Sequence, residues 1–276
     1  MQGLPRGADV PFVGRFKLSE ISNMDQTPLP FDFLSPRTYE EKGAKTVWLK
    51  ESRSGWNKRQ CTLQVCVSAD GVPRCQPLLI FRGAVKGDVR RKDEERKYAH
   101  SVDVLWNPKA YCNEDTMLFW IKHMYQFSSA YSTLGVEREP RLLSLDAFAP
   151  HLTPAVSRAL KAQKVTISVV PGGCTGMVQV LDVSLNKPLK DLIQEEQDNH
   201  YDTHIDEWQQ EKFNIGERRV LLTHWVARAW KRLHSEYKET IIKTFQAVGL
   251  SLNPNSSQDK ELLRVKGIPD ILVGNY

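Results

Sequence analysis

The chain has 276 residues, of which 41% are hydrophobic and 26% charged, which is enough apolar material for one globular core of ordinary to large size. It has no apolar run of the roughly 18 residues that a membrane span needs, and its start has no apolar stretch of signal-peptide length, so we expect neither a membrane protein nor a secreted one. The 38 Lys and Arg residues against 33 Asp and Glu give a net charge of +5, which permits nucleic-acid binding without requiring it. A nuclear or cytoplasmic protein is expected.

The five cysteines do not form the paired spacing of a zinc site, and the histidines do not form a zinc-binding cluster. We therefore expect reduced thiols in the core and in loops.

The first third of the chain predicts an antiparallel meander. Residues 1–16 are rich in Gly and Pro and should be loosely ordered. Residues 21–24 lead into Asp25 as a strand that ends in an acid, and a second strand is expected around 46–49. Alternating apolar residues predict a strand over 61–67, the Asp70-Gly71 turn follows, and 76–81 forms the return strand.

Residues 42–60 are basic, with two tryptophans among six Lys or Arg and one Glu. Such a strip suits a DNA backbone, but a solvated hairpin with core tryptophans explains it equally well. The candidate DNA-binding residues are Lys45, Lys50, Arg53, Lys58 and Arg59.

The middle of the chain predicts a surface loop over 82–101 and then a helix capped by Asn113. A short apolar strand over 142–145 ends at Asp146, and a second helix begins near Thr153 and runs to about residue 163. His151 lies five residues past Asp146 and could approach an active site there, although a loop or helix-cap role is the simpler interpretation.

The β-branched run 165–170 predicts a buried strand that ends in a Pro-Gly-Gly turn. A helix follows, and Asp182 in its first turn would by itself be a helix cap. Residues 194–217 are acidic and should face away from DNA or against a basic neighbour. A single long helix over 217–248 carries an apolar stripe that should close the domain, and the tail 253–276 has no recognisable motif.

Four segments together resemble the catalytic domain of pogo/Tigger-type DDE transposases, the group that includes centromere-protein-B-like and jerky-like proteins. They are NMDQTP at 23–28, LSLDAFAPHLTPAV at 143–156, VVPGGCTGMVQVLDVSLNKPLKDLI at 169–193 and VLLTHWVARAW at 220–230. The resemblance runs over about residues 17–252, and the 35 residues between Asp146 and Asp182 match the family spacing.

The resemblance implies an α/β protein with a ribonuclease-H-like mixed sheet, flanked by helices and followed by a C-terminal helical extension. Asp25, Asp146 and Asp182 would be the catalytic residues and would bind two Mg²⁺ or Mn²⁺ ions, with His151 and Gln179 supporting them. Paired carboxylates about 4 Å apart repel by about 4 kcal/mol at a protein-like dielectric, and cations remove that cost. The implied reaction is hydrolysis of a phosphodiester bond in double-stranded DNA followed by strand transfer. The resemblance also implies a nuclear protein that works as a homodimer.

The sequence departs from the family pattern at Val180, where a proline is usual, and at Ala147 and Phe148. Relatives carry a helix-turn-helix module before the catalytic domain, and residues 1–16 are too few for one. Two hypotheses therefore stay open. The chain is either a metal-dependent DNA endonuclease and strand transferase, or a domesticated or relic transposase domain that binds DNA or proteins without catalysis.

Overall fold

The computed structural model describes residues 12–31, 60–84, 89–125, 139–210, 212–255 and 257–267. Its centre is a six-stranded mixed sheet in the order β6-β5-β4-β3-β7-β8. The strands are β3 (Ile21–Pro30), β4 (Gln60–Ser68), β5 (Leu78–Arg82), β6 (Asp103–Asn107), β7 (Arg141–Asp146) and β8 (Val165–Val170). A two-stranded hairpin of β1 (Phe12–Val13) and β2 (Phe16–Lys17) precedes them.

Strand β4 pairs antiparallel to both β3 and β5, whereas β7 is parallel to both β3 and β8. This meander followed by parallel strands is the ribonuclease-H-like arrangement that the resemblance implied. The fold class is confirmed.

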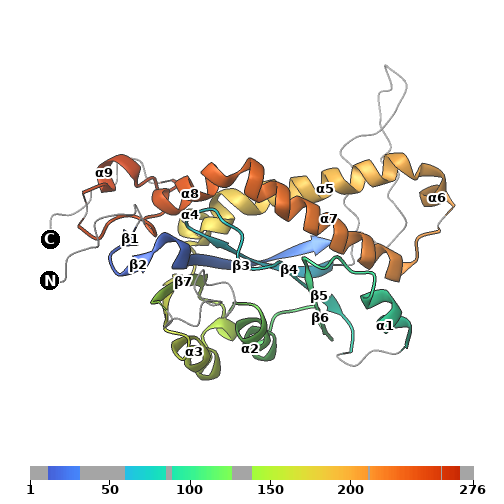
Figure 1. Ribbon diagram of the computed structural model, residues 1–276, viewed down its shortest axis with the longest axis horizontal. Coiled ribbons are helices and arrows are strands. Elements are labelled where there is room, and N and C mark those ends of the chain that lie inside the picture. Colours follow the sequence, from blue (N-terminus) through green and yellow to red (C-terminus); the bar gives the residue numbers. More distant parts are fainter. Residues whose placement is uncertain are drawn as a thin grey trace, which may run out of the picture.

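Helices cover both faces of the sheet (Figure 1). The helices α5 (Asn186–Thr203), α7 (Ile215–Glu236) and α8 (Lys238–Ala247) lie on one face, and α2 (Glu114–His123) and α3 (Pro154–Lys161) lie on the other. Strand β4 shows why: Leu63, Val65 and Val67 pack with α5 and α7, while Cys66 between them packs with α2. Side chains of a strand alternate between faces, so this strand fills two cores.

Shorter elements connect these layers. They are η1 (Leu18–Glu20), α1 (Val89–Glu95), η3 (Ala149–His151), α4 (Thr175–Val178), the π-helical turn η4 (Leu181–Leu185), α6 (Ile205–Gln209) and α9 (Asp259–Leu262). Within the described segments, no helix is both long and apolar enough to cross a membrane.

Two helix starts predicted from capping residues are confirmed. The side chain of Asn113 accepts a hydrogen bond from the backbone N–H of Thr116 at the start of α2. Thr153 does the same for Val156 at the start of α3, where Pro154 takes the first helical position. The described cysteines are free thiols, and four of the five are buried.

The prediction of a surface loop over 82–101 was wrong. This stretch contains α1, and the segment after it leads into β6, which pairs parallel to β5 at the sheet edge. The Glu94 carboxylate of α1 accepts two hydrogen bonds of 2.6 Å from Arg219 of α7. Charges that suggested a solvated loop therefore dock α1 onto the helical layer.

The single helix expected over 217–248 is two helices, α7 and α8, which meet at Tyr237. The predicted apolar stripe does face the core, with Trp225, Leu233 and Phe245 buried. The break lets α8 follow η4, where the hydroxyls of Ser184 and Thr244 are 2.9 Å apart.

The acidic stretch lies against a basic neighbour, one of the two arrangements expected for it. Glu195 and Glu196 of α5 form ion pairs with Arg232 of α7, and Glu196 also pairs with Arg228.

Two strands also differ in detail from the prediction. Asp25 lies within the ten-residue β3 rather than at a strand end. Strand β8 lies at the edge of the sheet, and Val169 in it is exposed, so it is not the fully buried strand expected. The strand predicted around 46–49 lies outside the described residues, as does the basic strip.

Candidate active site

Parallel pairing brings Asp25 and Asp146 to the same place in the sheet. Ile21 of β3 pairs with Leu142 of β7, and Asn23 pairs with Ser144. Carried two residues further, the same register sets Asp25 level with Asp146, which ends β7. Neighbouring strands lie about 4.8 Å apart, so two acids distant in sequence become neighbours.

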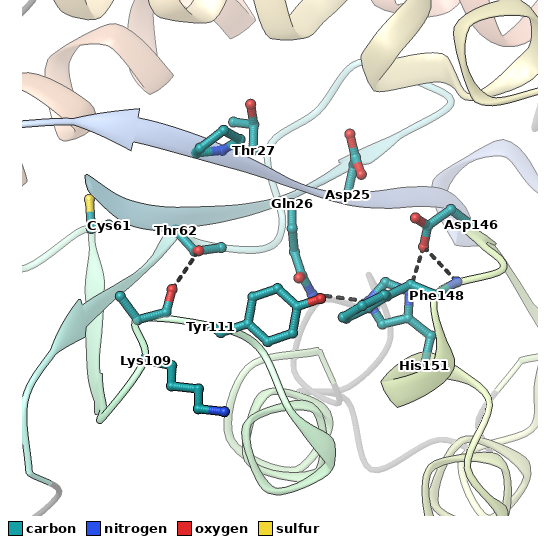
Figure 2. Close-up of a pocket in the computed structure, with 12 residues that line it drawn as sticks. Asp25, Gln26, Thr27, Cys61, Thr62, Lys109, Tyr111, Asp146, Phe148 and His151 are labelled. Atoms are coloured by element: carbon teal, nitrogen blue, oxygen red, sulfur yellow. Dashed lines mark hydrogen bonds and ion pairs between the residues drawn. The ribbon is translucent and has the colours of Figure 1, made fainter. Parts of the chain in front are cut away.

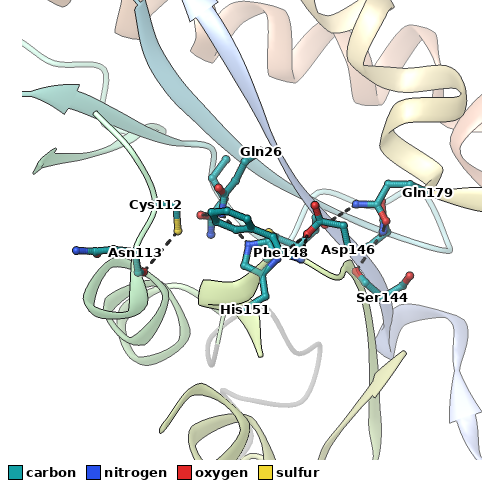
Figure 3. Close-up of polar contacts among 11 residues, drawn as sticks. Gln26, Cys112, Asn113, Ser144, Asp146, Phe148, His151 and Gln179 are labelled. Atoms are coloured by element: carbon teal, nitrogen blue, oxygen red, sulfur yellow. Dashed lines mark hydrogen bonds and ion pairs between the residues drawn. The ribbon is translucent and has the colours of Figure 1, made fainter. Parts of the chain in front are cut away.

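The turn that carries Asp182 is tied to β3 beside Asp25. The side-chain amide of Asn23 accepts a hydrogen bond from the backbone N–H of Leu181 at 3.1 Å and donates one to the Gln179 side chain at 3.2 Å. Gln179 in turn donates to the backbone carbonyl of Met24 at 3.3 Å. Gln179 is completely buried, and Figure 3 shows its polar contacts together with those of Asp146. It anchors η4 rather than contacting an acid directly.

Asn186 links two of the three acids. Its side-chain nitrogen donates to a carboxylate oxygen of Asp25 at 2.8 Å and to one of Asp182 at 2.9 Å. Both acceptors are bound by the same amide nitrogen, and Asn186 lies one helical turn past Asp182. Asp182 is not the helix cap, because Val180 occupies the cap position of η4 and Asp182 lies in the first turn after it.

The pKa of Asp25 is raised because this acid is buried and the other two acids lie close to it. Its burial, the negative charge of Asp182 and, to a smaller extent, that of Asp146 raise its pKa, which is about 6 instead of 3.8. Hydrogen bonds from Asn186 and from the backbone of Gln26 oppose this shift. The negative charges of Asp146 and Asp182 therefore both disfavour ionisation of Asp25.

Asp146 is held by His151, which lies in the short helix η3 just after β7. The imidazole Nδ1 lies 2.7 Å from a carboxylate oxygen of Asp146, and the other ring nitrogen lies 3.0 Å from the side-chain nitrogen of Gln26 (Figure 2). Since Gln26 donates with that nitrogen, the pattern fits a neutral imidazole whose Nδ1–H points at Asp146. Burial raises the pKa of Asp146, but its hydrogen bond and electrostatic interaction with His151, together with backbone hydrogen bonds, outweigh burial and lower that pKa. His151 therefore contacts a candidate catalytic acid directly, which the hypothesis of a supporting role requires.

The acids are held by protein donors in this structure. Within the described residues, no three His, Cys, Asp or Glu side chains are grouped closely enough to hold a metal ion. Asn186 lies between Asp25 and Asp182, and His151 holds Asp146. The donor set still suits a hard cation, because carboxylate oxygens are joined by the side-chain oxygen of Asn186, which is buried and has no hydrogen-bond partner among the described residues.

Sequence reasoning missed Asn186 and Lys190, which follow Asp182 at intervals of four residues. Lys190 is partly buried, and that burial lowers its pKa although the charges of Asp182 and Asp25 act in the opposite direction. Residues four apart share a helix face, so this spacing was the available signal. The candidate DNA contacts Lys45, Lys50, Arg53, Lys58 and Arg59 lie outside the described residues.

The fold and the arrangement of acids define a ribonuclease-H-like domain with an acidic site where the parallel strands β3 and β7 lie side by side. A family model described as "DDE superfamily endonuclease" matches residues 58–245, more than half of the chain. The chain belongs to this DDE endonuclease family.

Curated relatives point to the same group. A human protein named "Pogo transposable element with KRAB domain" is 25% identical over 256 residues, which cover 88% of this chain and 37% of the relative. Its mouse counterpart gives the same identity and coverage. A human "Pogo transposable element with ZNF domain" is 26% identical and covers 64% of this chain. The chain thus spans about a third of the length of the relatives that match most of it.

Among solved structures, the "mariner Mos1 paired end complex with Mg" is similar with a TM-score of 0.42 and 12% identity, covering 79% of this chain and 56% of that one. The "catalytic domain of Mos1 mariner transposase" gives a TM-score of 0.31 and 12% identity, with 80% and 83% coverage.

Proposed function

We propose that this chain is the catalytic domain of a metal-dependent DNA endonuclease and strand transferase of the transposase type. The observation that carries the proposal is the link through Asn186, which joins Asp182 to Asp25 at the point where the register of β3 and β7 brings Asp146 alongside. Membership of the DDE endonuclease family and the transposable-element names of the relatives support it.

Asp25, Asp146 and Asp182 would hold two Mg²⁺ or Mn²⁺ ions, to which their oxygen ligands are suited. Bound ions of this kind lower the pKa of an attacking water and stabilise the leaving 3′ oxygen during an in-line displacement at phosphorus. The raised pKa of Asp25 fits such a role, because a carboxyl group that is costly to ionise alone gains most from a nearby cation.

The surrounding residues would keep the acids in place. His151 orients Asp146 and keeps it ionised, and Gln26 fixes the imidazole from the other side. Gln179 and Asn23 hold the start of η4 against β3. The loss of a hydrogen bond to a metal-binding side chain typically changes metal affinity or activity ten- to a hundredfold, so the loss of these contacts should be measurable.

The proposed substrate is double-stranded DNA, and the proposed place of action is the nucleus. The names of the relatives refer to transposable elements, which are DNA. Action as a homodimer and the division of the chain at residues 16 and 252 remain proposals drawn from the family resemblance.

A plasmid-nicking assay tests the catalytic proposal. The purified chain should convert supercoiled plasmid to the open circle with Mn²⁺ or Mg²⁺ and not with EDTA. Asp146→Asn should abolish nicking, whereas Asp202→Asn, which removes an exposed carboxylate of α5, should not change it. A folded protein that nicks with neither ion would favour the relic hypothesis. The departures from the family pattern at Ala147, Phe148 and Val180 are the observations that support the relic hypothesis.

The basic strip can be tested separately from catalysis. Lys58→Glu combined with Arg59→Glu should weaken DNA binding and flatten its dependence on salt, because fewer counterions are released on binding. Lys238→Glu with Lys243→Glu, on α8, changes the charge equally and serves as the control. Unchanged affinity and salt dependence in the first variant would remove the strip from the interface.

A further inference from the structure

A cavity of about 430 Å³ opens beside Asp25 and Asp146 (Figure 2). Its lining includes these two acids, Phe148 beside Asp146, and Tyr111, Thr62 and Lys109 further from the acids. The volume lies within the usual range for small-ligand sites, roughly 300–1,000 Å³. It is therefore large enough for a ligand that also reaches the proposed cleavage site.

Two aromatic rings that contact each other form part of the cavity wall. The rings of Tyr111 and Phe148 meet edge to face, with centroids 5.2 Å apart and planes at 88°. Phe148 packs in the same way on His151, at 5.1 Å and 79°. Because His151 also holds Asp146, the rings are connected by direct contacts to one of the proposed metal ligands.

Tyr111 is presented by a turn that is held in a strained conformation. Ala110 has a φ of 53°, a left-handed conformation that side-chain-bearing residues rarely adopt. The hydroxyl of Thr62 donates to the Ala110 carbonyl at 2.7 Å, and the Ala110 N–H donates to the carbonyl of Asn107 at 3.0 Å. Strain of this kind persists where surrounding contacts fix it, often at binding sites. Tyr111 remains 51% exposed, so a face of the ring is open to a ligand.

We infer that this cavity receives one unstacked base of the DNA strand, from a nucleotide next to the phosphate held at Asp25 and Asp146. The inference rests on the proposed function, which places a phosphate at the acids and so brings a nucleotide to the mouth of the cavity. Bases stack on exposed aromatic rings, and the Lys109 ammonium group adds attraction for the backbone. A base inside an intact duplex is stacked on both sides and cannot offer a face to Tyr111.

The polar groups of the lining indicate how selective the pocket is. The side-chain nitrogen of Gln26 already donates to Gln64 and lies against His151, and the Thr62 hydroxyl is bound to Ala110. These two polar side chains of the lining are therefore already bonded within the protein. The pocket should hold any unpaired base by stacking, with weak preference among the four.

Two DNA probes test the inference: a fully paired duplex, and the same duplex with one unpaired 2-aminopurine nucleotide at its 3′ end. Binding is measured by anisotropy in Ca²⁺ and in EDTA, so that no cleavage is required. The parent should bind the second probe more tightly and quench its 2-aminopurine fluorescence. Tyr111→Ala should lose between about fivefold and a hundredfold in affinity for the second probe and leave the paired duplex unchanged.

Three controls make the outcome decisive. Tyr111→Trp keeps a stacking surface and should retain the preference, and Phe119→Ala removes an exposed ring of α2 outside the cavity and should change nothing. Phe148→Leu should reduce the quenching. The inference is overturned if the parent binds both probes equally, if Tyr111→Ala weakens both to the same extent, or if free deoxyadenosine monophosphate competes as well as the unpaired strand.

The plasmid-nicking assay separates this inference from the proposed function. If the protein nicks DNA but shows no preference for the unpaired base, the inferred base pocket is refuted and the proposed enzyme activity stands. If the preference depends on Tyr111 but no nicking occurs, the base pocket stands and the catalytic proposal is refuted.

Discussion

The side-chain nitrogen of Asn186 lies 2.8 Å from a carboxylate oxygen of Asp25, although 161 residues separate the two in sequence. The same nitrogen lies 2.9 Å from Asp182, so one neutral amide holds two like charges together. An ammonium group could neutralise both acids permanently, whereas an amide leaves their negative charge available to a cation. Asn186 therefore suits a site whose charge is to be balanced by a ligand.

If a third carboxylate replaces the Asn186 amide, the repulsion among the acids should destabilise the protein. We expect Asn186→Asp to lower the free energy of unfolding of the metal-free protein by about 1–3 kcal/mol at neutral pH, because two hydrogen bonds are lost and a negative charge is added. Mg²⁺ should recover more stability in this variant than in the parent. Urea unfolding with and without Mg²⁺ measures both effects.

Asn199→Asp makes the same charge change at an exposed position further along α5 and should alter the unfolding free energy by less than about 0.5 kcal/mol. Equal losses in the two variants would mean that the helix, and not the acid pair, responds to the substitution.

The raised pKa of Asp25 predicts the direction of a pH effect on stability. In the folded protein this pKa is about 6, above its value of 3.8 in an unfolded chain, so the folded state holds the proton more tightly. The stability contributed by Asp25 is fully present below pH 3.8 and is lost as pH rises to about 6. A shift of this size corresponds to an upper limit of about 3 kcal/mol.

Asp25→Asn should therefore unfold at higher urea concentration than the parent at pH 7.5 without metal, and the difference should shrink toward pH 4.5. Mg²⁺ should stabilise the parent and not the variant. The interpretation fails if Asp25→Asn is less stable than the parent at every pH.

The contact between His151 and Asp146 predicts a second change in ionisation. In His151→Ala the hydrogen bond that lowers the pKa of Asp146 is removed, so that pKa should rise, as carboxyl carbon NMR can measure. We also expect a ten- to hundredfold loss of Mn²⁺ affinity or nicking rate. His123→Ala removes an exposed imidazole of α2 and should do neither. A normal Mn²⁺ affinity in His151→Ala would limit the histidine to a packing role.

Local signals in the sequence predicted several of the elements that surround the acids. A β-branched run, capping residues and a change from strand to helix period located β8, α2, α3 and the helix after Asp182. What they could not give is contact between segments far apart in the chain. Asn186 reads as an ordinary surface residue until β3 folds beside η4, and the same holds for Tyr111 until the Ala110 turn places its ring against Phe148.

The errors have the same physical origin. Residues 82–101 look solvated because their charges are counted without their partners, and one of those partners is 125 residues away. Likewise, the stripe over 217–248 keeps helical spacing across Tyr237, so the pattern could not show that the chain bends there to follow the sheet. Periodicity reports which face is buried, and tertiary contacts decide where an element ends.

The ion pair between Glu94 and Arg219 gives a stability test of that docking. Glu94 accepts two hydrogen bonds of 2.6 Å from Arg219 and one of 2.5 Å from the Tyr98 hydroxyl, and the two charged side chains are 11% and 15% exposed. Arg219→Ala would leave a largely buried carboxylate with half of its partners, so we expect a loss of about 2–4 kcal/mol in unfolding free energy.

Arg228→Ala, which breaks a half-exposed pair on the same helix, should cost less than about 1 kcal/mol. The double variant Glu94→Met with Arg219→Met should recover most of the loss, because no unpaired charge remains. If Arg219→Ala and Arg228→Ala were equally mild in urea unfolding, α1 would not be held to α7 by this pair.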